Sequence, residues 1–161
     1  MENLKLTRID FRLIHGQVMT RWVKKYGITN IVVIDNKTAK NPILKKVLLN
    51  AAPAGIKVEI ETVESAAARW KENKMPTGNL LILFKDPASA KAAWEAGIEY
   101  PSLQVGGIEG SASKKNICRN IVMSEEDVEN LKPMYEAGVK VFCQPIPDDS
   151  EVSLKVAIEK F

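Results

Sequence analysis

The sequence predicts an α/β fold, an open, mainly parallel and twisted sheet of about six to seven strands with helices on both faces. Segments with the two-residue period of strands alternate along the chain with segments of helical period. Continuous apolar runs at 31–34 and 79–84 are typical of parallel strands covered on both sides. Glycine, proline, asparagine and aspartate gather between these patterns and mark the connections.

The first half of the chain contains three expected strands and two expected helices. They are a strand over 3–9, a helix from His15 to Gly27, a strand over 31–34, a helix from Pro42 to Pro53 and a strand over 56–62. Lys24 and Lys25 fall in the last turn of the first helix, where they complement its dipole. Asn41 and Pro42 form the start of the second helix, and its apolar stripe consists of Ile43, Leu44, Val47 and Leu48. Strict alternation in the third strand predicts a place near the sheet edge.

The second half continues the same alternation. The expected elements up to residue 123 are a helix over 65–74, a central strand over 79–84, a helix from Asp86 to Ala96, a strand over 102–105 that breaks at Gly106-Gly107, a loop over 108–120 that is compatible with small strands, and a strand over 121–123. After these come a helix from Ser124 to Gly138, a strand over 139–143, a turn at Pro145 and Pro147, and a last segment capped by Ser150, which is either a short helix or a hook onto the sheet. Ser124 is followed three residues later by an acid, which indicates a helix start. With no repeat or linker, residues 1–161 are expected to form a single domain.

Composition and charge exclude several classes of protein. The 23 basic and 20 acidic residues give a net charge of +3 and are scattered, which argues against nucleic-acid binding. Cys118 and Cys143 lie far apart, and one histidine cannot complete a zinc site, so no metal or cofactor is expected. We expect both thiols to be reduced, as in a cytosolic protein. There is no signal-peptide pattern and no apolar run of the roughly 20 residues that a membrane span needs.

One stretch, residues 8–18, concentrates the groups that could carry chemistry. His15 is the only histidine, and it stands where the first strand pattern gives way to the first helix. In open α/β sheets, ligands bind beyond the carboxyl ends of the strands. The free N–H groups and the dipole of a first helical turn also bind anions. The position therefore predicts a histidine that accepts a phosphoryl group.

The neighbours of His15 suit an anion. Gly16 and Gln17 would offer the phosphate-binding N–H groups of the first turn, and Gly16 lets a bulky anion come close to the backbone. Arg12 supplies a planar guanidinium that matches phosphate oxygens. Asp10 would hold a loop N–H or orient the imidazole.

Other interpretations of these residues remain open at this point. A lone histidine is more often a surface or packed residue than a catalyst, and Arg12 and Asp10 could form an ordinary surface ion pair. Gly106-Gly107 is compatible with a simple turn, and no GxGxxG or Walker A sequence supports nucleotide binding. Asp35 is favoured as a helix cap over a ligand. The tryptophans are favoured as core residues, namely Trp22, Trp70 and Trp94.

The stretch Ile9-Asp10-Phe11-Arg12-Leu13-Ile14-His15-Gly16-Gln17-Val18, followed by Arg21-Trp22, resembles a known family. It is similar to the enzyme IIB component of the mannose/fructose/sorbose class of the bacterial phosphoenolpyruvate-dependent sugar phosphotransferase system. The similarity continues through 31–35, 104–107 and 138–145 and covers essentially the whole chain.

The resemblance implies a cytoplasmic phosphocarrier that is peripherally associated with a membrane transporter. His15 would accept a phosphoryl group through Nδ1 from a phosphorylated IIA protein or domain. The group would then pass to a sugar bound by the membrane IIC and IID subunits, with Arg12 and Asp10 in the active-site loop. No cofactor is implied, and both the sugar and any homo-oligomer stay open.

Phe11 departs from the family pattern, because many members carry an acidic residue at this position. The side chain could offer an apolar contact to a partner, as could Leu13 and Ile14, although these two residues are equally suited to the core. The rival hypothesis is a non-catalytic small-molecule-binding or regulatory α/β module. The absence of a phosphate-binding glycine fingerprint counts against its nucleotide-binding form.

Overall fold

The structure is a computed structural model, and it describes residues 2–161 except the side chain of Gln17. Its strands are β1 (Leu4–Asp10), β2 (Asn30–Ile34), β3 (Lys57–Glu61), β4 (Leu80–Phe84), β5 (Ser102–Gly107), β6 (Lys115–Cys118), β7 (Ile121–Met123), β8 (Lys140–Cys143) and β9 (Val152–Ser153). Its helices are α1 (Gly16–Tyr26), α2 (Asn36–Ala39), α3 (Pro42–Asn50), α4 (Val63–Lys71), α5 (Pro87–Glu95), α6 (Glu125–Glu136) and α7 (Leu154–Ile158).

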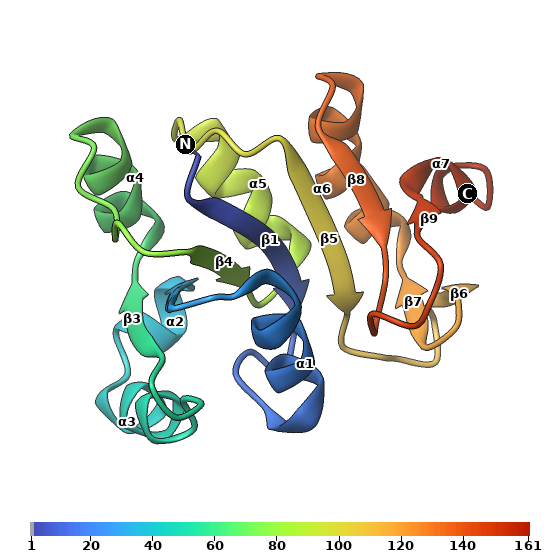
Figure 1. The fold of residues 1–161 in the computed structure, drawn as a ribbon. Coiled ribbons are helices and arrows are strands. Elements are labelled where there is room, and N and C mark those ends of the chain that lie inside the picture. Colours follow the sequence, from blue (N-terminus) through green and yellow to red (C-terminus); the bar gives the residue numbers. More distant parts are fainter. Residues whose placement is uncertain (1) are drawn as a thin grey trace.

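The predicted open α/β sheet is confirmed. Seven strands lie in the order β3-β2-β4-β1-β5-β8-β9 and pair in parallel, except for the antiparallel β9 (Figure 1). Edge strand β3 and central strand β4 stand where their sequence patterns predicted. The chain runs from β1 toward β2 on one side of β1 and later reaches β5 on the other, so the strand order reverses at β1.

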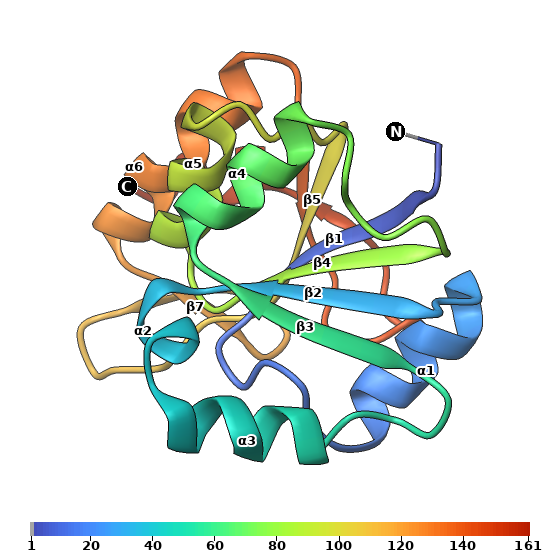
Figure 2. The same cartoon turned by 90° about the vertical axis from the view of Figure 1, so that its left-hand side faces the viewer.

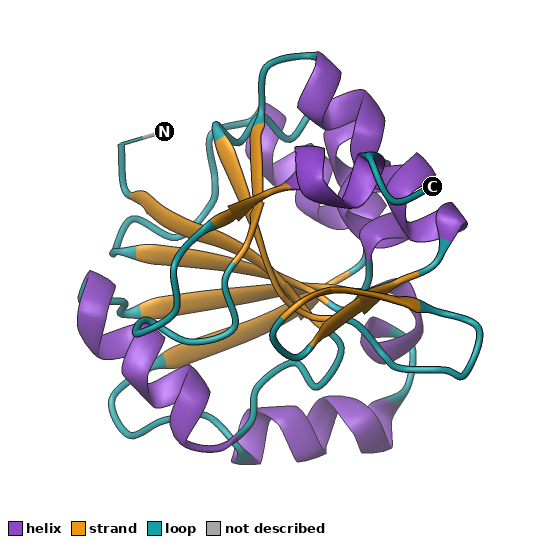
Figure 3. Ribbon diagram, turned by 90° about the vertical axis from the view of Figure 1, so that its right-hand side faces the viewer, coloured by secondary structure: helices purple, strands orange, loops and turns teal. Residues whose placement is uncertain are grey.

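Helices cover both faces of the sheet, as the continuous apolar strands require. Helices α1 and α3 lie on one face, and α4, α5 and α6 lie on the other (Figures 2 and 3). Each face has its own apolar core, one centred on Trp22 and Met19 of α1 and the other on residues of α4 to α7. Alternate residues of each strand supply the two cores, because successive side chains point to opposite faces.

Several predicted helix ends are confirmed by their hydrogen bonds. Gly27 ends α1 with a left-handed φ of 59°. Asn41 accepts two backbone N–H bonds at the start of α3, and Ser124 forms a capping box with Asp127 at the start of α6. Asp35 is a cap, as favoured, and its carboxylate accepts from the N–H of Thr38.

Other expectations were wrong. Strand β5 does not break at Gly106-Gly107 but includes both residues. Ser150 does not cap the last helix, because a short strand, β9, intervenes and Ser153 is the cap. The region 108–120, by contrast, does contain a small strand of the kind allowed for it, because β6 forms one arm of a small hairpin with β7. Helix α2 was not predicted, since four residues are too few to show a helical period.

Only some of the tryptophans and of the apolar residues on α3 are buried as expected. Trp22 is fully buried, whereas Trp70 and Trp94 are half-buried against the core. On α3, Leu48 packs partly against the core, while the rest of its expected stripe faces solvent. No helix within residues 2–161 has the length and apolar character to cross a membrane.

Candidate active site

The loop between β1 and α1 carries the candidate site. Strand β1 ends at Asp10 between β4 and β5, so the loop emerges where the strand order reverses. Leu13 adopts a left-handed φ of 57°, which is unfavourable for a side chain with a Cβ and is held in place by its own N–H bond to the Asp10 carbonyl. Such local strain is often found at functional loops. Leu13 and Ile14 are buried, so they belong to the core.

Asp10 is fully buried and gathers the charged groups of the site. Its Oδ2 accepts from Nη2 of Arg8 at 3.3 Å and from Nη2 of Arg12 at 3.1 Å. Its Oδ1 accepts from the backbone N–H and from Nε of Arg12, at 3.2 and 3.0 Å. Nε2 of His15 lies 3.8 Å from Oδ2. The carboxylate therefore holds a loop N–H, one of the two roles considered for it, and it lies near the imidazole without a hydrogen bond to it.

Arg8 is a component of the site that the sequence did not reveal. Its side chain is fully buried and donates to Oε1 of Gln104 and to the carbonyls of Gln144, at 3.1 Å, and Pro145, at 2.9 Å. Burial lowers the pKa of Arg8 to about 10, and Asp10 opposes this shift. At neutral pH the guanidinium is charged, and Asp10 is its counterion.

One signal in the sequence pointed to Arg8. It lies two residues before Asp10, so the two side chains share one face of β1. A buried face that carries both an arginine and an aspartate requires them to pair, because an isolated buried charge is very costly. The arginine also stacks on Trp22 of α1, with its Cζ 5.1 Å from the ring centroid.

Gly106 makes room for Arg8. A Cβ at this position would collide with the guanidinium of Arg8, so a larger residue would displace that side chain. Gly107 accepts a backbone bond from Phe11 at 3.2 Å. The two glycines are therefore residues of strand β5 that allow the strand to lie close to β1. The interpretation of Gly106-Gly107 as a simple turn is wrong.

Arg12 extends from Asp10 to solvent. Its side chain is 42% exposed, so part of the guanidinium can meet a ligand while the rest is held by the carboxylate. Phe11 lies beneath it, with the Cζ of Arg12 5.4 Å from the ring centroid. Phe11 thus packs against the guanidinium of Arg12.

His15 is the residue just before α1 and has an extended backbone. Its Nδ1 lies 2.9 Å from the carbonyl oxygen of Leu13. Because a carbonyl only accepts, Nδ1 carries a proton in this contact. The imidazole is 22% exposed, and Nε2 is buried with no hydrogen-bond partner among the described residues.

The N-terminus of α1 leaves space for an anion. Gly16 has a φ of +38°, which favours glycine, and a Cβ there would meet no atom within 4 Å. No acidic residue stands in the first turn of α1, so nothing there opposes a negative ligand. The side chain of Gln17 lies outside the described part of the structure, and its role as a phosphate ligand stays a prediction.

Two hollows open beside the loop. One, of about 320 Å³, is lined by His15, by Gly16 and Thr20 of α1, and by Ala51 and Pro53 beyond α3. The other, of about 400 Å³, is lined by Phe11, Arg12, Gly107 and the β6–β7 hairpin. His15 thus borders one hollow and Arg12 borders the other.

The structure brings together only some of the polar strand ends. The loop from Asp10 to His15 meets Gly107 through the N–H of Phe11. The Gln144-Pro145 segment is joined to the same region by Arg8 of β1, which donates to both carbonyls. Asp35 and Lys85-Asp86 instead line a separate hollow of about 440 Å³ that His15 does not enter. Over residues 2–161, no group of three or more histidine, cysteine or acidic side chains is placed to hold a metal ion.

Together, the fold and the site define an open α/β protein with a histidine and two arginines around a buried carboxylate at the switch point of the sheet. The family profile described as "PTS system sorbose subfamily IIB component" matches residues 4–161, and the chain belongs to this family.

Relatives of known specificity are similar over nearly the full chain. The fructose-specific EIIB component of Bacillus subtilis is 28% identical over 150 residues, which are 93% of this chain and 92% of that protein. The sorbose-specific EIIB component of Lacticaseibacillus casei is 29% identical over 157 residues, covering 98% and 96%. The mannose-specific EIIAB component of Escherichia coli is 28% identical over 155 residues, but the chain spans only 48% of its length.

Solved structures share the fold. The crystal structure of manxB from Thermoanaerobacter tengcongensis has a TM-score of 0.88 at 34% identity and covers 98% of this chain and 96% of that chain. The IIBSor domain of the sorbose permease from Klebsiella pneumoniae has a TM-score of 0.89 at 26% identity and covers 98% of each. IIB components take a phosphoryl group from IIA and pass it to sugar, so this chain is a sugar phosphotransferase component and a transferase. The rival binding-module hypothesis is not favoured.

Proposed function

We propose that His15 is the residue that carries the phosphoryl group. The observation that carries this proposal is that the chain's only histidine stands at the N-terminus of α1, between the buried Asp10 and the open first turn. Arg12 approaches the same carboxylate oxygen as His15, since Oδ2 of Asp10 lies 3.1 Å from Nη2 of Arg12 and 3.8 Å from Nε2 of His15. In this proposal, phosphorylated IIA is the donor, and a sugar bound by the membrane IIC and IID subunits is the acceptor.

The chemistry of the step needs position and charge more than acid–base catalysis. A nitrogen lone pair of His15 forms a bond to phosphorus while the phosphorus–nitrogen bond of the donor histidine breaks. His15 gives up the proton of its other ring nitrogen and the departing imidazole takes up one proton, so the number of bound protons stays the same overall. The charge spreads over the three equatorial oxygens of the phosphoryl group. The exposed part of Arg12 and the N–H groups of Gly16 and Gln17 stabilise these oxygens, because they are fixed before the group arrives.

The orientation of the imidazole has to change if Nδ1 is the acceptor. In the structure, Nδ1 donates to Leu13 and has no lone pair with which to attack phosphorus. A rotation about the Cβ–Cγ bond breaks this contact and turns Nδ1 away from the carbonyl. We therefore propose that the contact between His15 and Leu13 holds the unphosphorylated form and is lost on phosphorylation.

The partners follow from the proposed role. This chain is similar to half of a mannose-specific EIIAB component, whose name gives one protein both a IIA and a IIB part. That similarity supports a IIA protein or domain as the donor. The two hollows give separate approaches to the site. Transfer to a transported sugar supports a cytoplasmic location beside the membrane transporter.

Phosphoryl labelling tests the proposal. The protein is incubated with radioactive phosphoenolpyruvate, the general phosphotransferase proteins and a IIA protein, and the label is tested for acid lability and alkali stability. We expect the label in the wild-type protein and its loss in His15→Gln, which retains a polar side chain of similar size. Label of unchanged amount in this variant would refute the assignment of His15.

Nuclear magnetic resonance of nitrogen-labelled protein separates the two nitrogens. We expect phosphorylation at Nδ1, with the coupling to phosphorus on that atom and a changed chemical shift at the Leu13 carbonyl. Phosphorylation at Nε2 would leave the Leu13 contact in place and would contradict the proposed rotation, although His15 would still be the carrier.

A further inference from the structure

Helix α3 presents its apolar side chains to solvent. None of its residues is buried, whereas every other helix in the part of the chain that the structure describes has at least one buried residue. The exposed fractions are 76% for Ile43, 57% for Val47, 43% for Leu44 and 44% for Leu49. A helix on a protein surface ordinarily turns its apolar side to the core. A contiguous apolar face that points outward instead marks an interaction surface.

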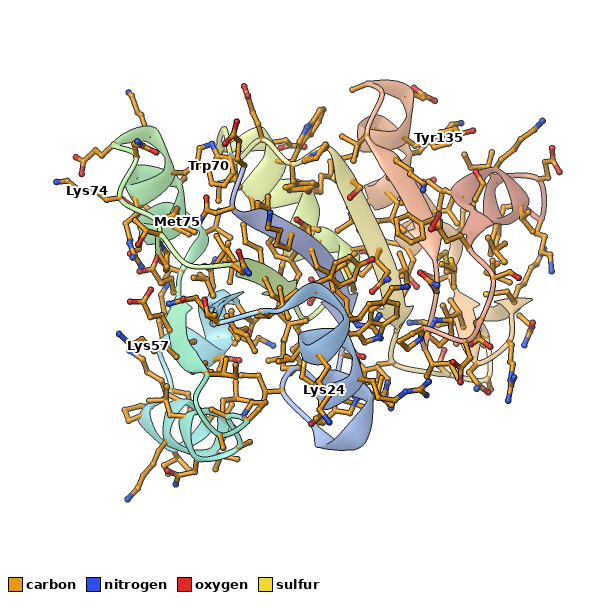
Figure 4. All side chains as sticks on the ribbon, in the orientation of Figure 1. Lys24, Lys57, Trp70, Lys74, Met75 and Tyr135 are labelled. Carbon is orange, nitrogen blue, oxygen red and sulfur yellow. The ribbon has the colours of Figure 1, made fainter. Side chains whose placement is uncertain are left out.

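The segment around α3 is strongly basic. Between Asn36 and Lys57 there are five lysines and no aspartate, glutamate, arginine or aromatic residue, although the whole chain carries only +3. Lys37, Lys40 and Lys46 are exposed. Figure 4 shows Lys57 extending outward from edge strand β3, above α3. The apolar face is therefore bordered by positive charge with no compensating acid in the segment.

This composition favours one kind of occupant. Protein interfaces are enriched in aromatic residues and arginine and depleted in lysine, which is the opposite of this surface. A second copy of the chain would bring equal positive charge against it. An anionic bilayer surface attracts lysines and accepts aliphatic side chains at the boundary between headgroups and acyl chains.

We propose that α3 is a membrane-contact helix that docks the protein on an anionic lipid surface. The aliphatic side chains of Ile43, Leu44 and Val47 enter the headgroup boundary, and the neighbouring lysines face the lipid phosphates. Ala51 and Pro53, just beyond α3, form one wall of the hollow that holds His15. Docking by α3 would thus keep His15 close to the membrane. This lipid contact goes beyond the proposed phosphoryl transfer and can hold or fail independently of it.

The expected binding is weak and reversible. Each lysine near an anionic leaflet strengthens partitioning by about fivefold, so the four exposed lysines, Lys37, Lys40, Lys46 and Lys57, together strengthen it on the order of 10³-fold. Because the attraction acts across water, added salt should reduce it steeply.

Co-sedimentation with lipid vesicles tests the proposal. We expect the wild-type protein to bind vesicles that contain phosphatidylglycerol and not vesicles of pure phosphatidylcholine. The triple variant Lys37→Glu/Lys40→Glu/Lys46→Glu should bind more than about 100-fold more weakly, since each reversal removes a fivefold attraction and adds repulsion. Absence of wild-type binding at low salt and several millimolar lipid would overturn the proposal, and an acidic protein would then be the better candidate occupant.

A matched control separates this surface from net charge. The variant Lys71→Glu/Lys132→Glu/Lys155→Glu makes the same change of charge on exposed lysines of α4, α6 and α7, on the opposite layer. It should keep most of the binding, and a loss as large as that of the α3 variant would overturn the assignment to α3.

A second variant tests the apolar contribution. Ile43→Ser/Val47→Ser changes only exposed positions, so the fold should persist, and circular dichroism checks this. Binding should weaken about tenfold, because two aliphatic side chains no longer leave water. Unchanged binding would overturn the insertion of α3 and leave only charge attraction.

Discussion

The substitution Asp10→Asn should destabilise the protein strongly although it replaces only one carboxylate oxygen by an amide nitrogen. Arg8 and Asp10 both have fully buried side chains, and Nη2 of Arg8 lies 3.3 Å from the carboxylate. The remaining acceptors of Arg8 are neutral groups, namely the side chain of Gln104 and two backbone carbonyls. Asparagine therefore leaves a buried guanidinium without a counterion.

The expected loss can be worked out from this geometry. Removing one partner of a buried ion pair costs about 3–5 kcal/mol. The contact with Arg12 adds little, because Arg12 is 42% exposed and water screens it. A domain of this size loses about 2–4 °C of melting temperature per kcal/mol, so Asp10→Asn should melt roughly 10 °C lower.

Urea unfolding measures the loss and a double-mutant cycle tests its cause. The double variant Arg8→Met/Asp10→Asn no longer contains the uncompensated charge. Its loss of unfolding free energy should therefore be smaller, by at least about 1 kcal/mol, than the sum of the losses in the two single variants. Asp148→Asn is the control, because Asp148 is 72% exposed and pairs with Arg21 on the surface, where a change within about 0.5 kcal/mol is expected. The reasoning is refuted if Asp10→Asn costs less than about 1 kcal/mol, or if the two losses add.

Three more predictions follow from other parts of the structure. Arg12→Ala should slow phosphoryl transfer by about 10²–10³-fold, while its stability in urea stays nearly unchanged. Arg69→Ala on α4 is the control and should not slow the transfer. Equal transfer rates for the two variants would exclude Arg12 from the mechanism. Gly106→Ala should lower the unfolding free energy by about 1–3 kcal/mol, because its Cβ collides with Arg8, and Gly110→Ala, where a Cβ has room, should not. Burial raises the pKa of Tyr100, whose hydroxyl donates to the Ala90 carbonyl. Because the folded state binds the hydroxyl proton more tightly than the unfolded state does, the free energy of unfolding should fall above about pH 10. Urea unfolding below and above that pH should show a smaller fall in Tyr100→Phe than in the wild-type protein. An equal fall in the two proteins would show that Tyr100 is not its cause.

The caps and strands that the sequence predicted are those whose causes are local. Ser124 and Asp127 lie three residues apart and satisfy each other's backbone groups, so their pattern alone predicts the start of α6. The apolar run at β4 requires cover on both faces wherever the strand stands. The wrong predictions at Ser150 and Gly106 have causes far away along the chain. The residues after Ser150 pair with β8 as strand β9 before the last helix begins, and Gly106 lies in a strand beside the side chain of Arg8.

The sequence by itself determined where the site lies, because His15, Gly16 and the first turn of α1 are neighbours along the chain. Only the tertiary structure decided what surrounds it. The carbonyls of Gln144 and Pro145 reach Arg8 from more than 130 residues away, and they do so because β5 and β8 follow β1 in the sheet. The exposure of the apolar side chains of α3 likewise depends on the tertiary structure. Periodicity predicts which side chains share a face, but only the packing of distant elements determines whether that face is covered.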